Sequence, residues 1–191
     1  MPLIVQLTQN RGPDHAPSRG LYPQSVMEEY RIMKKNTFGR LGWQVTEMGY
    51  GAWSLGGSYG EIPESDKFAA LNTYIEEGGN FIDTARGYGE SENIIGRWMQ
   101  DTGVREDIYL CSKIWPNDTD KIREHMDESL RKLQVDVIDL MYVHNPPDDP
   151  DEMNRVLDVY ADFKEQGKIK AIGASIKGRN VTEHTQELIR Q

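Results

Sequence analysis

The segment Val137-Ile-Asp-Leu-Met-Tyr-Val143 is the most apolar strand candidate in the chain, and together with the residues after it, it decides the fold class. Residues 151–166 place apolar side chains at helical spacing, and Gly167 marks the end of that helix. A second short apolar run, Lys170-Ala-Ile-Gly-Ala174, comes directly afterwards. Two short apolar strands joined by an amphipathic helix predict a β–α–β unit, in which the strands run parallel.

The same alternation extends in both directions along the chain. The pattern predicts a small hairpin around residues 38–46, strands at 47–53, 80–83 and 107–112, and helices at 64–77, 90–100, 118–133 and from 180 onward. It indicates an α/β protein with a parallel sheet, either a doubly wound open sheet or part of a (β/α)8 barrel. In both architectures, functional residues lie at the carboxyl ends of the strands.

Composition limits the classes of function. The chain has 191 residues, of which 37% are hydrophobic and 28% charged, as expected for one globular domain with a core. Its net charge of −9 argues against nucleic-acid or anionic-membrane partners. No apolar run approaches the roughly 18 residues of a membrane span. Cys111 is the only cysteine, which suits a reducing, cytoplasmic compartment.

The first residues differ from the rest in composition. Residues 1–32 contain four prolines and show no sustained periodicity. We therefore expect either a disordered leader or a start site assigned too far upstream, with the folded domain at residues 33–191.

Ionisable residues end three consecutive predicted strands. Asp83, Lys113 and His144 occupy these positions, and Tyr88 follows Asp83 closely. Taken singly, each is more typical of a cap, a solvated charge or a packing residue. Neighbouring strand ends are about 4.8 Å apart, so the four side chains together can converge on one pocket suited to proton transfer. The glycine-rich segment 49–57 after the first strand matches a dinucleotide fingerprint only loosely.

These segments resemble the aldo-keto reductases. Phe81-Ile-Asp-Thr-Ala-Arg-Gly-Tyr-Gly89 looks like the family signature D-T-A-x-x-Y-G, and Ser112-Lys113 and Val143-His144 look like the next two strand ends. Residues 42–57 resemble the family's hairpin and first strand, and the resemblance continues in order to Gln191. It implies a (β/α)8 TIM barrel that reduces an aldehyde or ketone to an alcohol with NADPH.

The resemblance also assigns roles to the four strand-end residues. Tyr88 would protonate the substrate oxygen, and the Lys113 ammonium would favour ionisation of that phenol. Asp83 would hold Lys113 in place, and His144 would orient the carbonyl. The residues that match the family's nicotinamide site, and that the cofactor would contact, are Gly51, Ala52, Trp53, Asp83 and Ser175. The resemblance implies no metal in the site. Ile176 departs from the family, which often has Asn there to bind the carboxamide.

Length is the larger departure from the family. A complete barrel takes about 250 residues, so we expect a chain truncated after about five β–α units. Three functions stay open. They are a carbonyl reductase whose full-length parent carries the activity, a binding module like the ion-channel accessory subunits among the family's relatives, and an inactive remnant. Neither the substrate nor the oligomeric state can be read from the sequence.

Overall fold

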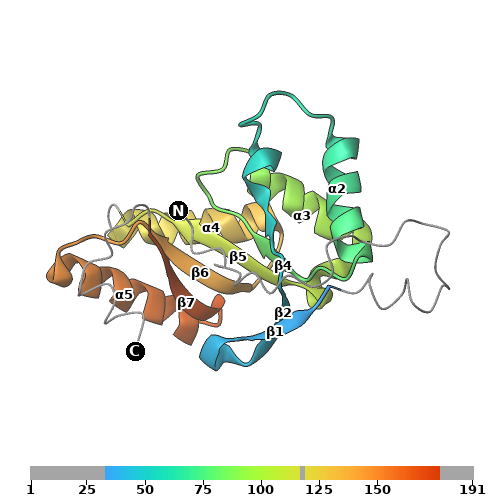
Figure 1. Ribbon diagram of the computed structural model, residues 1–191. Coiled ribbons are helices and arrows are strands. Elements are labelled where there is room, and N and C mark those ends of the chain that lie inside the picture. Colours follow the sequence, from blue (N-terminus) through green and yellow to red (C-terminus); the bar gives the residue numbers. More distant parts are fainter. Residues whose placement is uncertain (1–32, 117–118, 177–191) are drawn as a thin grey trace, which may run out of the picture.

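A computed structural model describes residues 33–116 and 119–176, which contain a parallel sheet with helices between its strands (Figure 1). The predicted α/β class is confirmed. The sheet order is β3-β4-β5-β6-β7, with β3 at Tyr50–Gly51, β4 at Phe81–Asp83, β5 at Tyr109–Ile114, β6 at Ile138–His144 and β7 at Ile169–Ser175. Each strand pairs with the next in the sequence, whereas a doubly wound sheet reverses its order part-way. The continuous order therefore favours the barrel alternative.

Helices connect the successive strands and pack on the sheet. Their bounds are α2 (Glu64–Glu76), α3 (Ser91–Thr102), α4 (Thr119–Leu133) and α5 (Pro150–Glu165). α5 begins one residue before the predicted start at 151, because the Asp149 side chain accepts a hydrogen bond of 2.8 Å from Glu152 N and Pro150 occupies the first turn. The large core cluster lies between helices and strands and includes the fully buried Trp98 and Tyr160.

The other face of the sheet carries alternate residues of each strand. The strand register places Asp83 beside Cys111, Lys113 beside Tyr142 and His144 beside Ser175. Because side chains alternate along a strand, these residues share one face, opposite to the helices. A second, smaller core cluster of Cys111, Leu140 and Ala171 lies on this face.

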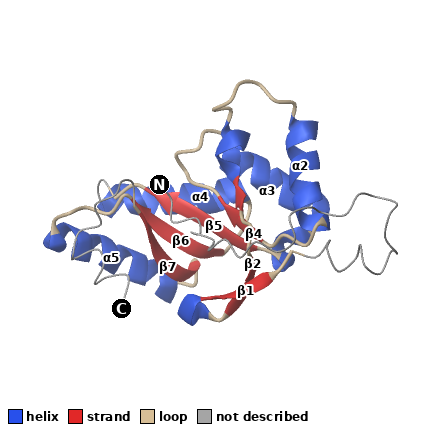
Figure 2. Cartoon of the chain, in the orientation of Figure 1, coloured by secondary structure: helices blue, strands red, loops and turns tan. Residues whose placement is uncertain are grey.

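A two-stranded hairpin lies at the amino-terminal end of the sheet (Figure 2). Its strands are β1 (Lys35–Phe38) and β2 (Trp43–Thr46), joined by the 3₁₀ turn η1 (Gly39–Leu41). The Trp43 ring stacks on Tyr109 at a centroid distance of 4.9 Å, and Phe38 packs on Phe81 at 5.4 Å. The hairpin therefore covers the start of β4 and β5 and leaves their carboxyl ends open.

Two elements differ from the sequence prediction. The predicted strand at 47–53 contains only the two-residue β3, because Ala52–Gly56 turns into the 3₁₀ helix η2. A further 3₁₀ helix, η3 (Val104–Asp107), precedes β5 and was not anticipated. The predictions for residues 1–32 and for a helix after residue 180 lie outside the described residues. In the described part of the chain, no helix is both long and apolar enough to cross a membrane.

Candidate active site

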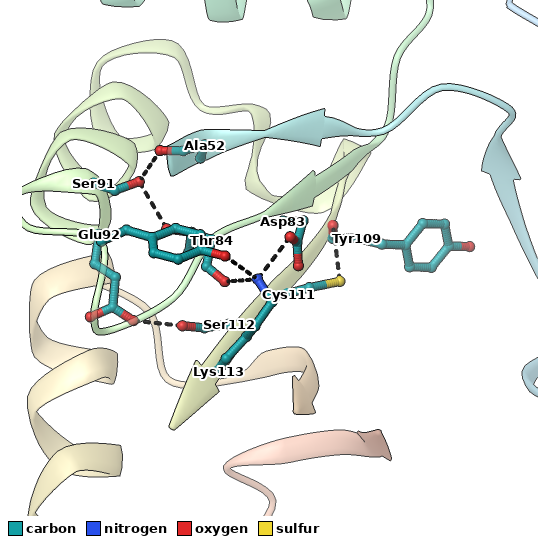
Figure 3. Close-up of polar contacts among 10 residues, drawn as sticks. Ala52, Asp83, Thr84, Ser91, Glu92, Tyr109, Cys111, Ser112 and Lys113 are labelled. Carbon is teal, nitrogen blue, oxygen red and sulfur yellow. Dashed lines mark hydrogen bonds and ion pairs between the residues drawn. The ribbon is translucent and has the colours of Figure 1, made fainter. Parts of the chain in front are cut away.

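The Lys113 ammonium is the centre of the polar cluster at the carboxyl end of the sheet (Figure 3). Its Nζ lies 2.8 Å from Asp83 Oδ2, 2.7 Å from the Thr84 carbonyl oxygen and 3.3 Å from Tyr88 Oη. A lysine ammonium has three N–H donors and no acceptor. These three contacts therefore use every donor of Lys113, which is only 2% exposed.

Tyr88 reaches Lys113 from the loop between β4 and α3. Backbone packing holds this loop, because an added Cβ on Gly56 of η2 would lie 1.8 Å from the Tyr88 carbonyl oxygen. Only glycine fits at such a close backbone approach. The loop thus places the phenol on the same side of the sheet as Lys113.

His144, the last residue of β6, faces Tyr88. The two ring centroids are 6.2 Å apart with the planes nearly perpendicular, and Trp115 stacks on the imidazole at 4.3 Å. Burial, together with the nearby Lys113 charge, lowers the pKa of His144 to about 4. The imidazole is therefore neutral at pH 7. Its Nδ1 is buried without a hydrogen-bond partner among the described residues, which is uncommon for a buried polar atom.

Burial also dominates the electrostatics of Asp83. Desolvation raises the pKa of this carboxyl above its usual value, and the Lys113 charge and hydrogen bond only partly oppose the effect. A perturbed carboxyl, an ammonium, a phenol and an imidazole thus meet in one place. Such a group of residues is typical of sites that transfer protons.

The residues predicted to contact a cofactor border this cluster. Gly51 pairs with Asp83 across the sheet, and Ser175 pairs with His144. Trp53 is 52% exposed, and its ring centroid lies 6.5 Å from that of Tyr88. Ala52 is fully buried, and its carbonyl oxygen accepts a hydrogen bond from Ser91. The structure therefore brings all four catalytic candidates together, with the cofactor candidates around them.

Sequence reasoning missed a second polar layer behind these residues. It consists of buried hydroxyl and carboxyl groups between the strands and the helices, Thr84, Ser91, Glu92, Ser112 and Ser129. One signal was available, because Glu92 shares a helical face with the apolar Ile95 and Met99. Among the described residues there is no group of three or more His, Cys, Asp or Glu side chains that could hold a metal ion.

Similarity to known proteins shows the family of this chain. The sequence profile of the aldo/keto reductase family matches residues 47–189. The chain belongs to the aldo/keto reductase family. It is 36% identical over 144 residues to the aldo-keto reductase str7 of Strobilurus tenacellus, covering 69% of this chain and 42% of that protein. It is 34% identical over 126 residues to a probable voltage-gated potassium channel subunit beta of Oryza sativa, covering 60% of this chain and 38% of that protein.

Solved aldo-keto reductases share the fold. The crystal structure of an aldo-keto reductase from Klebsiella pneumoniae in complex with NADPH has a TM-score of 0.69 and 28% sequence identity, with 83% of this chain and 54% of that chain covered. The described residues of this aldo/keto reductase chain therefore form five consecutive strands of the TIM-barrel fold of its family. The chain spans less than half of the length of the curated relatives named above.

Proposed function

We propose that the site at the carboxyl end of the sheet reduces an aldehyde or ketone to an alcohol with NADPH. In this reaction the carbonyl carbon gains a hydride, the carbonyl oxygen gains a proton, and NADPH becomes NADP⁺. The observation that carries the proposal is the hydrogen bond between Lys113 Nζ and Tyr88 Oη. Because the ammonium can only donate, Tyr88 Oη is the acceptor in this bond, and its own hydrogen is left to point elsewhere.

Tyr88 is accordingly the proposed proton donor. Negative charge develops on the substrate oxygen as the hydride arrives, and a nearby O–H group can neutralise it. The Lys113 ammonium stabilises the phenolate that remains. Asp83 holds that ammonium in position, through the 2.8 Å contact between Lys113 Nζ and Asp83 Oδ2.

His144 is proposed to orient the carbonyl. Its imidazole faces the Tyr88 ring edge-on, and its pKa of about 4 keeps it neutral at pH 7. A neutral imidazole has one N–H donor, which can bind the substrate oxygen without competing as an acid.

The proposed cofactor contacts lie at the same strand ends. NADPH supplies the hydride when it is bound. Gly51 fits this use because an added Cβ there would meet nothing within 4 Å, which leaves open space beside Asp83. Trp53, Ser175 and the backbone of Ala52 are the other proposed contacts. The solved relative in complex with NADPH supports the choice of cofactor.

Two other functions have some support. Similarity to the probable potassium channel subunit of Oryza sativa favours a binding module that retains the four side chains. An inactive chain is the third alternative, which the turnover assay below distinguishes from the other two. The small carbonyl substrate and the cytoplasmic location are part of the proposal.

The test combines cofactor binding and turnover on the purified chain. We expect NADPH oxidation with a panel of aromatic and aliphatic aldehydes and ketones, and we expect Tyr88→Phe to lower kcat by about 10²- to 10⁴-fold with NADPH affinity retained. Tyr59→Phe is the matched control, because Tyr59 is an exposed tyrosine that packs on Trp53 rather than on Lys113.

Three results would contradict the proposal in different ways. Near-normal turnover in Tyr88→Phe would remove Tyr88 as the proton donor. NADPH binding without turnover of any carbonyl would favour the binding module. Neither binding nor turnover would favour the inactive chain.

A further inference from the structure

Two consecutive residues in the first turn of α3 hold the two strand ends that carry Asp83 and Lys113. Ser91 is 0% exposed and Glu92 is 1% exposed, so both side chains lie between the helix and the sheet. Ser91 bonds to the residue after Asp83, and Glu92 bonds to the residue before Lys113. Neither contact involves the phenol, the ammonium or the imidazole of the site itself.

The Glu92 contact acts on β5. Ser112 Oγ donates to Glu92 Oε1 at 2.7 Å, and Ser129 Oγ of α4 donates to Glu92 Oε2 at 3.3 Å. Successive side chains of a strand point to opposite faces, so Ser112 faces the helices while Lys113 faces the site. The bond to Glu92 therefore restrains β5 from sliding or rotating relative to α3 next to Lys113.

The Ser91 contact acts on the end of β4. Ser91 Oγ donates to the Ala52 carbonyl oxygen at 2.8 Å, and the Thr84 hydroxyl lies 2.8 Å from Ser91 Oγ. Since Ser91 has one hydroxyl hydrogen, Thr84 is the donor in the second bond. The carbonyl oxygen of Thr84 is one of the three acceptors around Lys113 Nζ. The same helical turn thus bonds to Thr84, which accepts from the ammonium, and to Ser112, which precedes Lys113.

Burying the carboxyl group of Glu92 at this position costs free energy. Desolvation raises the pKa of its carboxyl, and the two nearby cations, Arg86 and Lys132, are both paired with Glu128. Its helical face otherwise carries apolar side chains, and an apolar residue of similar size would avoid the cost of burying a carboxyl. A leucine at position 92 could not accept the hydrogen bond from Ser112.

We propose that Glu92 is a positioning residue for carbonyl reduction, acting through Ser112 to hold the Lys113 ammonium beneath the Tyr88 hydroxyl. This inference rests on the proposed function for its kinetic consequence, and on the geometry alone for the placement of Lys113. Glu92 touches no reacting atom. Its contribution is to limit how far β5 can shift relative to α3, and a displacement of about 1 Å at a reacting group can cost up to about a hundredfold in rate.

The experiment compares two buried serines that donate to the same carboxyl. Ser112→Ala and Ser129→Ala each remove one hydrogen bond to Glu92, but only Ser112 adjoins Lys113. We expect Ser112→Ala to lower kcat about tenfold at nearly constant KM, and Ser129→Ala to change kcat less than about twofold. Glu92→Leu should behave like Ser112→Ala, and Glu92→Gln, which can still accept from Ser112, should restore most of the loss.

A second readout does not need turnover. Crystal structures of the two serine variants give the distance between Lys113 Nζ and Tyr88 Oη, which is 3.3 Å in the unmodified chain. Ser112→Ala should lengthen this distance beyond about 3.5 Å, where the two atoms no longer form a hydrogen bond. Ser129→Ala should leave it unchanged.

These readouts separate the two proposals. If the unmodified chain reduces no carbonyl, the proposed function fails and the distance between Lys113 Nζ and Tyr88 Oη alone decides the positioning role. If Ser112→Ala and Ser129→Ala lose equal stability in urea and keep this distance at its original value, Glu92 is only structural and the inference is wrong. An equal increase of the distance in both serine variants would also overturn it.

Discussion

Lys113 is a buried cation that adds little to the stability of the fold but contacts the proposed proton donor, Tyr88. A buried ion pair such as Lys113–Asp83 contributes little to folding, because desolvating both charges offsets their attraction. In this pair all three ammonium donors are used, and one of them reaches Tyr88 Oη. Its location at the open end of the sheet, beside a half-buried imidazole, is consistent with a catalytic role.

The low pKa of His144 predicts how the stability of the protein changes with pH. Its pKa is about 4 in the folded chain and about 6.5 when it is unfolded. As the pH falls from about 6.5 to 4, the unfolded state binds a proton that the folded state does not, so the free energy of unfolding decreases. The protein should thus lose stability over this window, and His144→Asn should lose less. Urea unfolding at several pH values measures the difference, and parallel profiles of the two proteins would contradict it.

At the scale of elements, η2 supports the loop that carries Tyr88. The contact is between backbones, because an added Cβ on Gly56 would lie 1.8 Å from the Tyr88 carbonyl oxygen. Gly56→Ala must therefore displace either η2 or the loop. We expect a loss of about 1–3 kcal/mol in the free energy of unfolding and a lower kcat in any reductase assay.

The matched control for Gly56→Ala is Gly51→Ala. Gly51 has φ of −84° and open space around an added Cβ, so alanine should change the free energy of unfolding by no more than about 0.5 kcal/mol. Thermal or urea unfolding of both variants provides the comparison. Equal losses in the two would show that the close approach of Gly56 to Tyr88 is not what makes glycine necessary.

The opposite end of the sheet depends on Asp139 of β6. This carboxyl is 1% exposed, accepts a hydrogen bond of 2.9 Å from Leu110 N of β5, and pairs with Arg105 and with Lys170 of β7. Asp139→Ala leaves the buried Leu110 N–H without its acceptor, whereas the two cations are partly exposed, so we expect a loss of about 1–3 kcal/mol in the free energy of unfolding.

Asp127→Ala serves as the control for Asp139. Asp127 pairs with Lys168 at 2.6 Å, but its side chain is 66% exposed, and an exposed ion pair contributes at most about 1 kcal/mol. Urea unfolding distinguishes the two variants. A loss for Asp139→Ala as small as that for Asp127→Ala would mean that the inter-strand contacts of Asp139 carry no net stability.

At the scale of the whole molecule, the hairpin protects one face of the sheet. Trp43 stacks on Tyr109, and behind these rings lies the small cluster that contains Cys111. Burial, together with the charges of Asp83 and Asp139, raises the pKa of the Cys111 thiol, so it should react slowly at neutral pH. Trp43→Ser should loosen the hairpin and speed modification of this thiol at least about tenfold.

The thiol measurement is specific because Cys111 is the only cysteine in the chain. The rate of labelling by a disulfide reagent is followed in native buffer. Leu41→Ser is the control, since Leu41 lies at the exposed turn of the same hairpin and is absent from both core clusters. Equal labelling rates in the unmodified protein and in Trp43→Ser would show that the hairpin does not cover Cys111.

The sequence by itself determined the order of elements and the strand-end residues. Hydrophobic periodicity is a local property, so the alternation of strands and helices and the positions of Asp83, Lys113 and His144 could be read without coordinates. The predicted helix at 64–77 and strand at 137–143 agree with α2 (Glu64–Glu76) and β6 (Ile138–His144) to within one residue at each end. The catalytic roles of the strand-end residues remain predictions.

Only the tertiary structure decided which side chains meet. The predicted strand at 47–53 was too long, because β3 ends at Gly51 and the chain turns into η2. Gly56 of η2 packs closely against the backbone of Tyr88. The bond between Glu92 and Ser112 joins residues 20 positions apart. Such contacts depend on the register of neighbouring strands and on how each helix lies against the sheet. Periodicity shows which face of an element is buried, and only the packing of the whole chain shows what that face touches.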